Sequence, residues 1–216
     1  EVFFTMGGSN KYTQTFNIIT GGTAVNIDVD QLTGLHAGAA VNSKTRGVTM
    51  GGRANPSPYA ESNVIQFFEF TTRGNYADFG DLTESKGRNS GHGDPTRGIS
   101  FEKQSAGSDV IEFITISSTG NGTDFGNLTV AREMGAAFGN RTRGCYAGGN
   151  TPGDGGARKS IDFVIIASTG DSSDFGEVVQ ERFDFQGGMG NGVRAVFAGG
   201  YKHCLLYTSP SPRDRT

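Results

Sequence analysis

The sequence of 216 residues contains no tryptophan, only 6 prolines and 2 cysteines, and no long apolar run. A membrane-spanning helix needs about 20 consecutive apolar residues, so we predict no membrane span. One cysteine lies in an atypical C-terminal tail, which leaves Cys145 alone in the rest of the chain. A single cysteine forms neither an intramolecular disulfide nor a cysteine metal cluster. We interpret Cys145 as a small core hydrophobe.

The C-terminal residues depart from the pattern of the preceding chain. The run from Cys204 to Asp214, CLLYTSPSPRD, resembles the translation of a sequencing adapter. We therefore expect residues 202–216 to be a non-native, disordered tail and exclude them from fold reasoning. The chain begins at Glu1 inside an expected strand, so we also expect the natural protein to start earlier.

Charge of one sign is not concentrated anywhere in the chain. The formal net charge is −3, and the tail carries a net +2, which leaves −5 for residues 1–201. A nucleic-acid-binding surface requires clustered lysine and arginine. The mildly acidic chain therefore predicts no nucleic-acid partner.

Glycine, in contrast, is abundant, with 35 copies. The sequence also repeats, because three markers recur at intervals of 46 to 51 residues: an arginine before a Gly-pair strand, a phenylalanine in an apolar strand, and the triplet Asp-Phe-Gly. The markers stand at Arg46, Arg97, Arg143 and Arg194; at Phe67, Phe113 and Phe163; and at Asp78, Asp124 and Asp174. A fixed period of this length indicates repeated supersecondary units.

Each unit divides into four short segments without a helical apolar stripe, so we predict four strands per unit. The third strand is apolar on both faces. In residues 109–116, Ile111 and Phe113 lie on one face and Ile114 and Ile116 on the other. Such a strand must be covered on both faces. Sheets stacked around an axis provide that cover, which predicts an all-β propeller with its Gly- and Ala-rich first strands at the axis.

The period, the Gly pair and the aromatic third strand resemble kelch repeats over residues 1–201. The resemblance implies a partial, open propeller of three complete four-stranded blades between two partial ones. The complete blades would span residues 34–84, 85–131 and 132–181, and the partial ones 1–33 and 182–201. The phrasing of the units is also similar to repeat proteins of bacteriophage virions and tails. That similarity implies a virion or extracellular location.

Several groups admit a chemical as well as a structural interpretation. Asp-Phe-Gly occurs in kinase metal sites, but its recurrence at the repeat period predicts a turn with a core aromatic. The repeated arginines suit an anion site or bonds to neighbouring carbonyls, and their presence in every unit favours the bonds. Gly187–Gly192 lacks the helix that a phosphate loop requires. Asp94, Asp154 and Asp171 match no calcium-binding pattern. We predict no metal and no cofactor.

The loops differ between units while the strands do not, and such loops often form the binding face of a repeat protein. The kelch resemblance implies that the loops between second and third strands, and those between units, emerge on one face. They hold the residues that we predict to bind a ligand: Arg53, Asn55, Tyr59, Lys86, Arg132, Asn150 and Arg158. The predicted function is a non-catalytic module that binds a protein or a glycan, with other virion subunits among the candidate partners.

A propeller-based enzyme, glycan-active or oxidase-like, is the alternative. It would need carboxylates, or His36 with His92, to converge near the axis. The axial strands consist mostly of Gly, Ala, Ser and Asn, which favours the binding module. A third alternative, a purely structural role of the repeats in a large assembly, remains open. For any single predicted residue, a place in a solvent-exposed loop without a binding role also remains open.

Overall fold

The computed structural model describes residues 2–5, 13–17, 19–27, 30–54, 58–101, 108–151 and 156–201. These ranges contain eighteen strands and no helix, and none of their segments could cross a membrane as a helix. Two predictions fall elsewhere. Asn55 and the tail at 202–216 lie outside the described residues.

The strands form five antiparallel sheets that follow one another along the chain. Sheet 1 contains β1 (Val2–Thr5), β2 (Thr13–Phe16) and β3 (Val25–Asn26). Sheet 2 contains β4 (Leu35–His36), β5 (Ala39–Asn42), β6 (Arg46–Ala54), β7 (Glu61–Glu69) and β8 (Ala77–Lys86). Sheet 3 contains β9 (Ser90–Gly93), β10 (Arg97–Phe101), β11 (Val110–Thr115) and β12 (Thr123–Asn127).

Sheet 4 contains β13 (Ala136–Gly139), β14 (Arg143–Ala147), β15 (Ser160–Ile165) and β16 (Ser173–Glu177). Sheet 5 contains β17 (Phe183–Gly190) and β18 (Ala195–Tyr201). In sheets 3 and 4 each strand pairs with the next in chain order, and sheet 2 repeats this path from β5 to β8. The additional strand β4 pairs with the far end of β6.

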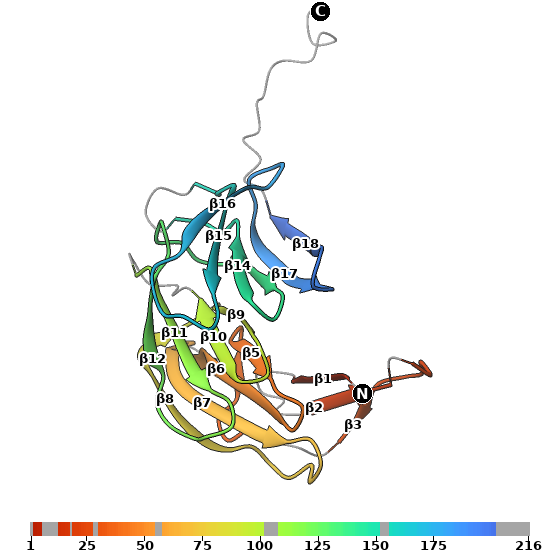
Figure 1. Cartoon of the computed structure of the whole chain (residues 1–216). Coiled ribbons are helices and arrows are strands. Elements are labelled where there is room, and N and C mark those ends of the chain that lie inside the picture. Colours follow the sequence, from red (N-terminus) through yellow and green to blue (C-terminus); the bar gives the residue numbers. More distant parts are fainter. Residues whose placement is uncertain are drawn as a thin grey trace, which may run out of the picture.

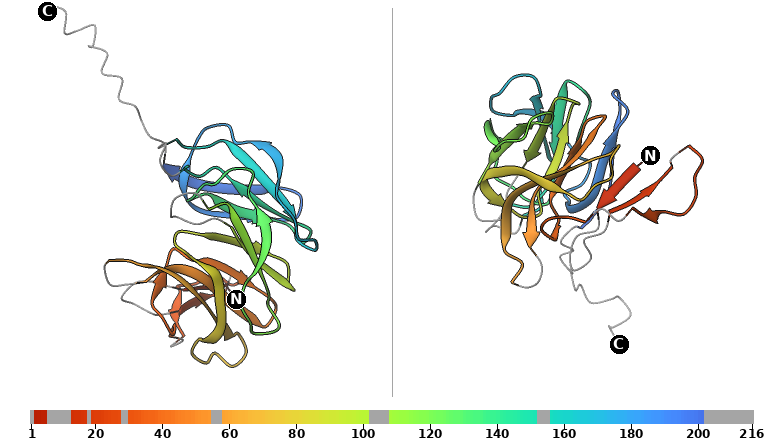
Figure 2. Two further views of the ribbon diagram at one scale, coloured as in Figure 1. Left: turned by 90° about the vertical axis from the view of Figure 1, so that its left-hand side faces the viewer. Right: turned by 90° about the horizontal axis from the view of Figure 1, so that it is seen from below.

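The sheets fan out around a common axis like the blades of a propeller (Figures 1 and 2). The first strands of consecutive units, β5, β9, β13 and β17, contact one another in that order. The prediction that small-residue strands lie at the axis is therefore confirmed. So is the all-β, partial propeller with three complete sheets between two smaller ones. The exact domain boundaries stay a prediction.

The core lies between the sheets. One cluster joins Ile65 and Phe79 of sheet 2 to Ile114 and Ile116 of the next sheet. An equivalent cluster joins sheet 3 to Val164 and Ile166 of the next sheet. Each third strand thus contributes one face to its own sheet's junction and the other to the preceding junction, as its two apolar faces require.

The triplet Asp-Phe-Gly forms a β-bulge that contacts the next sheet. Phe79 and Phe125 are buried, 3% and 2% exposed. Their carbonyls accept hydrogen bonds from the N–H groups of Gly120 and Gly170, which lie in the Ser-Thr-Gly turn of the following sheet (2.7 and 2.6 Å). The structural interpretation of the triplet is therefore the correct one for these two units.

Candidate functional site

Two residues predicted to bind a ligand lie inside the protein instead. The ammonium group of Lys86 is fully buried, 3.2 Å from a carboxylate oxygen of Glu112 in the next sheet. Arg132 is also fully buried, with its guanidinium 3.2 Å from the carboxylate of Asp162. The prediction that Lys86 and Arg132 stand on exposed loops is wrong. An unpaired buried charge is costly, so each cation is matched by an acid on the facing third strand.

The two ion pairs occupy equivalent positions of the repeat, and we call them junction pairs. Glu112 and Asp162 each directly precede the repeated phenylalanine. The Glu112 carboxylate accepts the N–H of Thr83 (2.6 Å), and that of Asp162 accepts the N–H of Thr129 (2.9 Å). A neutral version precedes them, because the side-chain oxygen of Gln66 accepts the N–H of Thr33 (3.3 Å). The junction pairs fasten neighbouring sheets.

The repeated arginines also have a structural role. Arg46 donates to the carbonyl of Ile116 (3.1 Å) and Arg97 to that of Ile166 (3.0 Å), each in the next sheet. The guanidinium of Arg97 lies 4.6 Å from the ring centre of Phe113, a distance that suits a cation–π contact. For these arginines the prediction of bonds to neighbouring carbonyls is confirmed.

The described members of the predicted rim that remain accessible gather at one end of the propeller. Tyr59 is 44% exposed, and its backbone carbonyl accepts a hydrogen bond from Nε of Arg53 (3.1 Å). The Arg53 guanidinium lies 5.9 Å from the Tyr59 ring centre. The ring of His36 packs perpendicular to the Tyr59 ring, with 5.6 Å between ring centres. These three side chains form a cluster that is partly open to solvent.

The other accessible predicted residues flank a loop of sheet 4. Asn150 exchanges two backbone hydrogen bonds with Glu133 (2.8 Å each). Arg158 is half-buried and donates from Nε to the hydroxyl of Thr151 (2.6 Å). Both residues are therefore held in place by hydrogen bonds.

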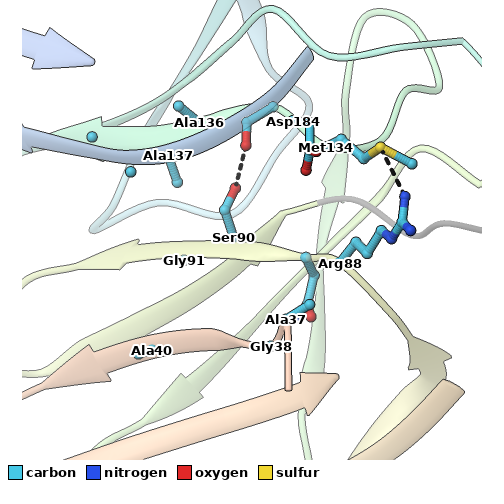
Figure 3. A pocket seen from close by; sticks show the side chains of 14 residues that line it. Ala37, Gly38, Ala40, Arg88, Ser90, Gly91, Met134, Ala136, Ala137 and Asp184 are labelled. Atoms are coloured by element: carbon cyan, nitrogen blue, oxygen red, sulfur yellow. Dashed lines mark hydrogen bonds between the residues drawn. The ribbon is translucent and has the colours of Figure 1, made fainter. Parts of the chain in front are cut away.

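A cavity of about 480 Å³ opens at the same end, on the propeller axis (Figure 3). Its floor consists of small residues of the inner strands, among them Ala40, Gly91 and Ala137. Four residues stand at its edge, and we call them the mouth residues: Ala37, Arg88 and Met134, which precede β5, β9 and β13, and Asp184, which lies near the start of β17. Nη1 of Arg88 lies 3.2 Å from the sulfur of Met134.

The mouth residues share one unusual backbone conformation. Their φ angles are 55°, 55°, 59° and 58° in chain order, and none of them is glycine. A left-handed conformation costs a non-glycine residue about 1–2 kcal/mol. The fold therefore repeats a strained backbone position in four successive units, whereas the side chains there are small, cationic, apolar and anionic. Nothing in the sequence marks this set, because the four side chains have nothing in common.

Glu133 precedes the mouth residue of sheet 4, and its side chain is buried, 7% exposed. Burial raises the pKa of Glu133, whereas a hydrogen bond from the Asn150 side chain and the positive charges of Arg88 and Arg53 act in the opposite direction. Desolvation is the largest of these effects, so the pKa of Glu133 is raised on balance.

The raised pKa predicts a pH-dependent stability. From the ordinary value of 4.5 upward, folded Glu133 retains a proton that the unfolded chain has released. Its contribution to the unfolding free energy therefore falls as pH rises through that window. We expect the stability of Glu133→Gln, relative to the unchanged protein, to increase over the same window in urea unfolding series. The exposed Glu177→Gln is the control, and a pH-independent difference for Glu133→Gln would contradict the assignment.

The enzyme alternative requires carboxylates, or His36 with His92, to converge near the axis. Neither His36 nor His92 lines the axial cavity, and Asp184 is its one described carboxylate. His92 instead bonds the carbonyl of Asn140 (3.0 Å), and burial lowers its pKa. Within the described ranges, no three His, Cys, Asp or Glu side chains stand close enough to hold a metal ion.

The fold and the axial cavity define a β-propeller-type protein built from sequence repeats. No protein-family profile and no curated protein matches the chain. Among solved structures 141 chains match. One fold can carry many unrelated functions, so these matches do not identify a function for this chain. One of them, described as "Structure of YjhT", is a propeller-type protein with a TM-score of 0.70 and 11% sequence identity, over 89% of this chain and 69% of that one. At this identity the likeness shows the fold alone.

Proposed function

We propose that the protein is a non-catalytic propeller module that binds another protein through the end that carries the axial cavity. The observation that supports this most is the set of mouth residues, where one backbone conformation presents four different side chains. A repeated backbone position with different side chains suits recognition of a partner. The residues that repeat, such as the junction pairs, stabilise the fold instead.

The chemistry of this end favours a protein partner over a glycan. Its accessible side chains include Arg53, Tyr59, Arg88 and Met134, of the types that are enriched at protein interfaces. Asp184 and Glu61 supply negative charge beside these arginines, so a partner segment of mixed charge would be complementary. The similarity to bacteriophage repeat proteins would place that partner among other virion subunits, and the kelch resemblance remains part of this proposal.

The test selects peptides that bind the immobilised full chain from a random 12-residue display library. In parallel, a glycan array is probed with the same protein. We expect peptides whose affinity falls at least roughly tenfold on Arg53→Ala and Arg88→Gln, since hot-spot truncations cost this much. Lys44→Ala and Arg141→Ala are matched controls, because both residues are exposed in the turns between first and second strands.

Two outcomes would contradict the proposal. Selected peptides that bind all four variants equally would place recognition elsewhere. Glycans that bind in an Arg88-dependent manner, without any selected peptide, would assign the same end to carbohydrate.

A further inference from the structure

The turn between the first and second strands has the same construction in four successive units. Its first residue is Ser43, Asp94, Asn140 or Asn191. The backbone N–H of that residue donates to the carbonyl of the residue three positions further on, at 2.9 to 3.1 Å. Its side-chain oxygen accepts the backbone N–H groups two and three positions further on. The turn therefore requires a side-chain oxygen at its first position.

The second residue of this turn leaves its backbone nitrogen available. Lys44, Pro95, Arg141 and Gly192 occupy the position, and all four are exposed. Proline has no backbone N–H, so the turn at Pro95 forms without one. Within the described ranges, no group accepts a hydrogen bond from the N–H of Lys44, Arg141 or Gly192. Sheets 3 and 5 follow the turns at Lys44 and Arg141, so a following sheet does not cover this position.

Of the four turns, the one at Asn191 places a glycine after an asparagine. The backbone nitrogen that follows an asparagine can attack the carbon of the side-chain amide and displace ammonia. Glycine hinders this attack least, because it has no Cβ. Apart from its chain neighbours, no atom lies within 4 Å of the place that a Cβ of Gly192 would take. The surroundings of Gly192 therefore leave room for the attack.

The turn also stabilises the charge that the attack creates. When the nitrogen bonds to the side-chain carbon of Asn191, negative charge develops on the side-chain oxygen. That oxygen already accepts the N–H groups of Val193 (3.1 Å) and Arg194 (2.9 Å). Two backbone donors that are in place before the reaction act as an oxyanion hole does.

The other Asn-Gly sequence of the chain, Asn121–Gly122, lies in a different environment. Gly122 is buried, and its N–H donates to the carbonyl of Asp81 in the preceding sheet (2.7 Å). The side-chain oxygen of Asn121 accepts the N–H of Asp81 (3.0 Å). This hydrogen bond must open before the Gly122 nitrogen can attack, so the folded structure protects Asn121.

We propose that Asn191–Gly192 is a self-modification site, at which the folded chain converts Asn191 to aspartate and isoaspartate without an enzyme. Hydroxide removes the proton from the Gly192 nitrogen, and this nitrogen bonds to Cγ of Asn191. The bond from Cγ to Nδ2 then breaks, and ammonia leaves with a proton from water, which restores the hydroxide. Water opens the resulting succinimide at either of its two carbonyl carbons.

The two products differ in their effect on the turn. Aspartate is compatible with it, because Asp94 accepts the same pair of N–H groups in the turn of sheet 3 (2.7 Å each). Isoaspartate lengthens the backbone by one carbon and moves the carbonyl that held the turn into the main chain. We therefore expect the isoaspartate form to loosen the hairpin of β17 and β18.

The experiment incubates the full chain, folded, at mildly alkaline pH and follows the loss of each side-chain amide with time. Samples are digested at mildly acidic pH, and liquid chromatography with mass spectrometry separates the asparagine, aspartate and isoaspartate peptides. We expect Asn191 to react at least roughly tenfold faster than Asn121, because the N–H of Gly122 is held by a hydrogen bond. In urea this difference should disappear, since unfolding releases that N–H.

Asn140 is a matched control within the same protein. Its side-chain oxygen accepts two backbone N–H groups as that of Asn191 does (2.9 and 2.8 Å), but Arg141 follows it. We expect Asn140 to react slowly in the unchanged chain. Arg141→Gly should accelerate its reaction at least roughly tenfold, because the variant removes the Cβ that hinders the attack.

Three results would overturn the proposal. In the folded chain, loss at Asn191 that is no faster than at Asn121 would show that the turn protects Asn191. A difference between these two residues that persists in urea would assign it to the neighbouring sequence. An unchanged rate at Asn140 in a folded Arg141→Gly chain would show that this turn resists the attack. The turn lies at the opposite end of β17 from the mouth residue Asp184, so none of these results bears on the proposed protein-binding end.

Discussion

Asp162→Ala is expected to lower the free energy of unfolding by about 3–5 kcal/mol, because it leaves a buried cation without its partner. Arg132 is fully buried, and a guanidinium does not release its proton in a protein. The Asp162 carboxylate also accepts hydrogen bonds from the N–H and hydroxyl of Thr129 and from the hydroxyl of Ser172 (3.1 Å). All of these donors would lose their acceptor.

Equilibrium urea denaturation followed by far-ultraviolet circular dichroism measures this loss. The control is Asp174→Ala, since Asp174 is exposed and its carboxylate accepts a hydrogen bond from the N–H of Gly176, two residues further on. Surface changes of this kind usually cost under about 1 kcal/mol. The double variant Arg132→Met with Asp162→Leu should recover at least half of the loss, because it removes both charges together. A small effect of Asp162→Ala alone would contradict the role of the junction pairs.

Gly126→Ala is expected to destabilise the protein by about 1–3 kcal/mol more than Gly176→Ala. The two glycines hold the same place in Asp-Phe-Gly and have nearly the same φ, 142° and 139°, so the backbone strain of an alanine is the same at both. A Cβ at Gly126 would press on the carbonyl of Gly170 in the next sheet and lie 2.8 Å from the N atom of Asp171. A Cβ at Gly176 would meet nothing within 4 Å.

The difference between the two variants therefore isolates the contact between sheets. The difference in unfolding free energy is obtained from the urea midpoints, provided that the dependence of the free energy on urea concentration has the same slope in both variants. Equal losses for the two alanine variants would show that the strained backbone, and not the next sheet, requires glycine there. Gly80→Ala offers a second comparison, because its Cβ would lie 2.5 Å from the carbonyl oxygen of Gly120.

The sequence predicted the sheets because their markers are local. Glycine-rich turns and apolar third strands recur at one period, and a strand such as Val110–Thr115 shows its two apolar faces without knowledge of its neighbours. The structural roles of Asp-Phe-Gly and of Arg46 and Arg97 followed from the same recurrence.

The junction pairs escaped prediction because the two partners belong to different units. Charge alone places Lys86 and Arg132 on the surface, since lysine and arginine are rarely buried. A usable signal was present, however. An acid stands directly before the repeated phenylalanine at Glu112 and Asp162, and a basic residue follows the threonine of the preceding unit by three positions.

The sequence predicted ligand binding for residues of the variable loops, and that role stays a prediction. Arg53 and Tyr59 contact each other, and Asn150 and Arg158 lie beside the loop of sheet 4. The mouth residues had no detectable signature, because a left-handed backbone at Arg88 or Met134 follows from the path of the chain into the inner strand and not from residue type.

We propose that the repeating residues fasten the sheets, whereas the non-repeating residues at the axial end bind the partner. The most direct measurement determines the dissociation constant of one selected peptide and the melting temperature for Arg88→Gln and for the double variant Arg132→Met with Asp162→Leu. We expect Arg88→Gln to weaken binding at least roughly tenfold with little change in melting temperature. We expect the double variant to change the melting temperature and to leave the dissociation constant within about twofold. Weakened binding in the double variant, with unchanged binding in Arg88→Gln, would contradict the account.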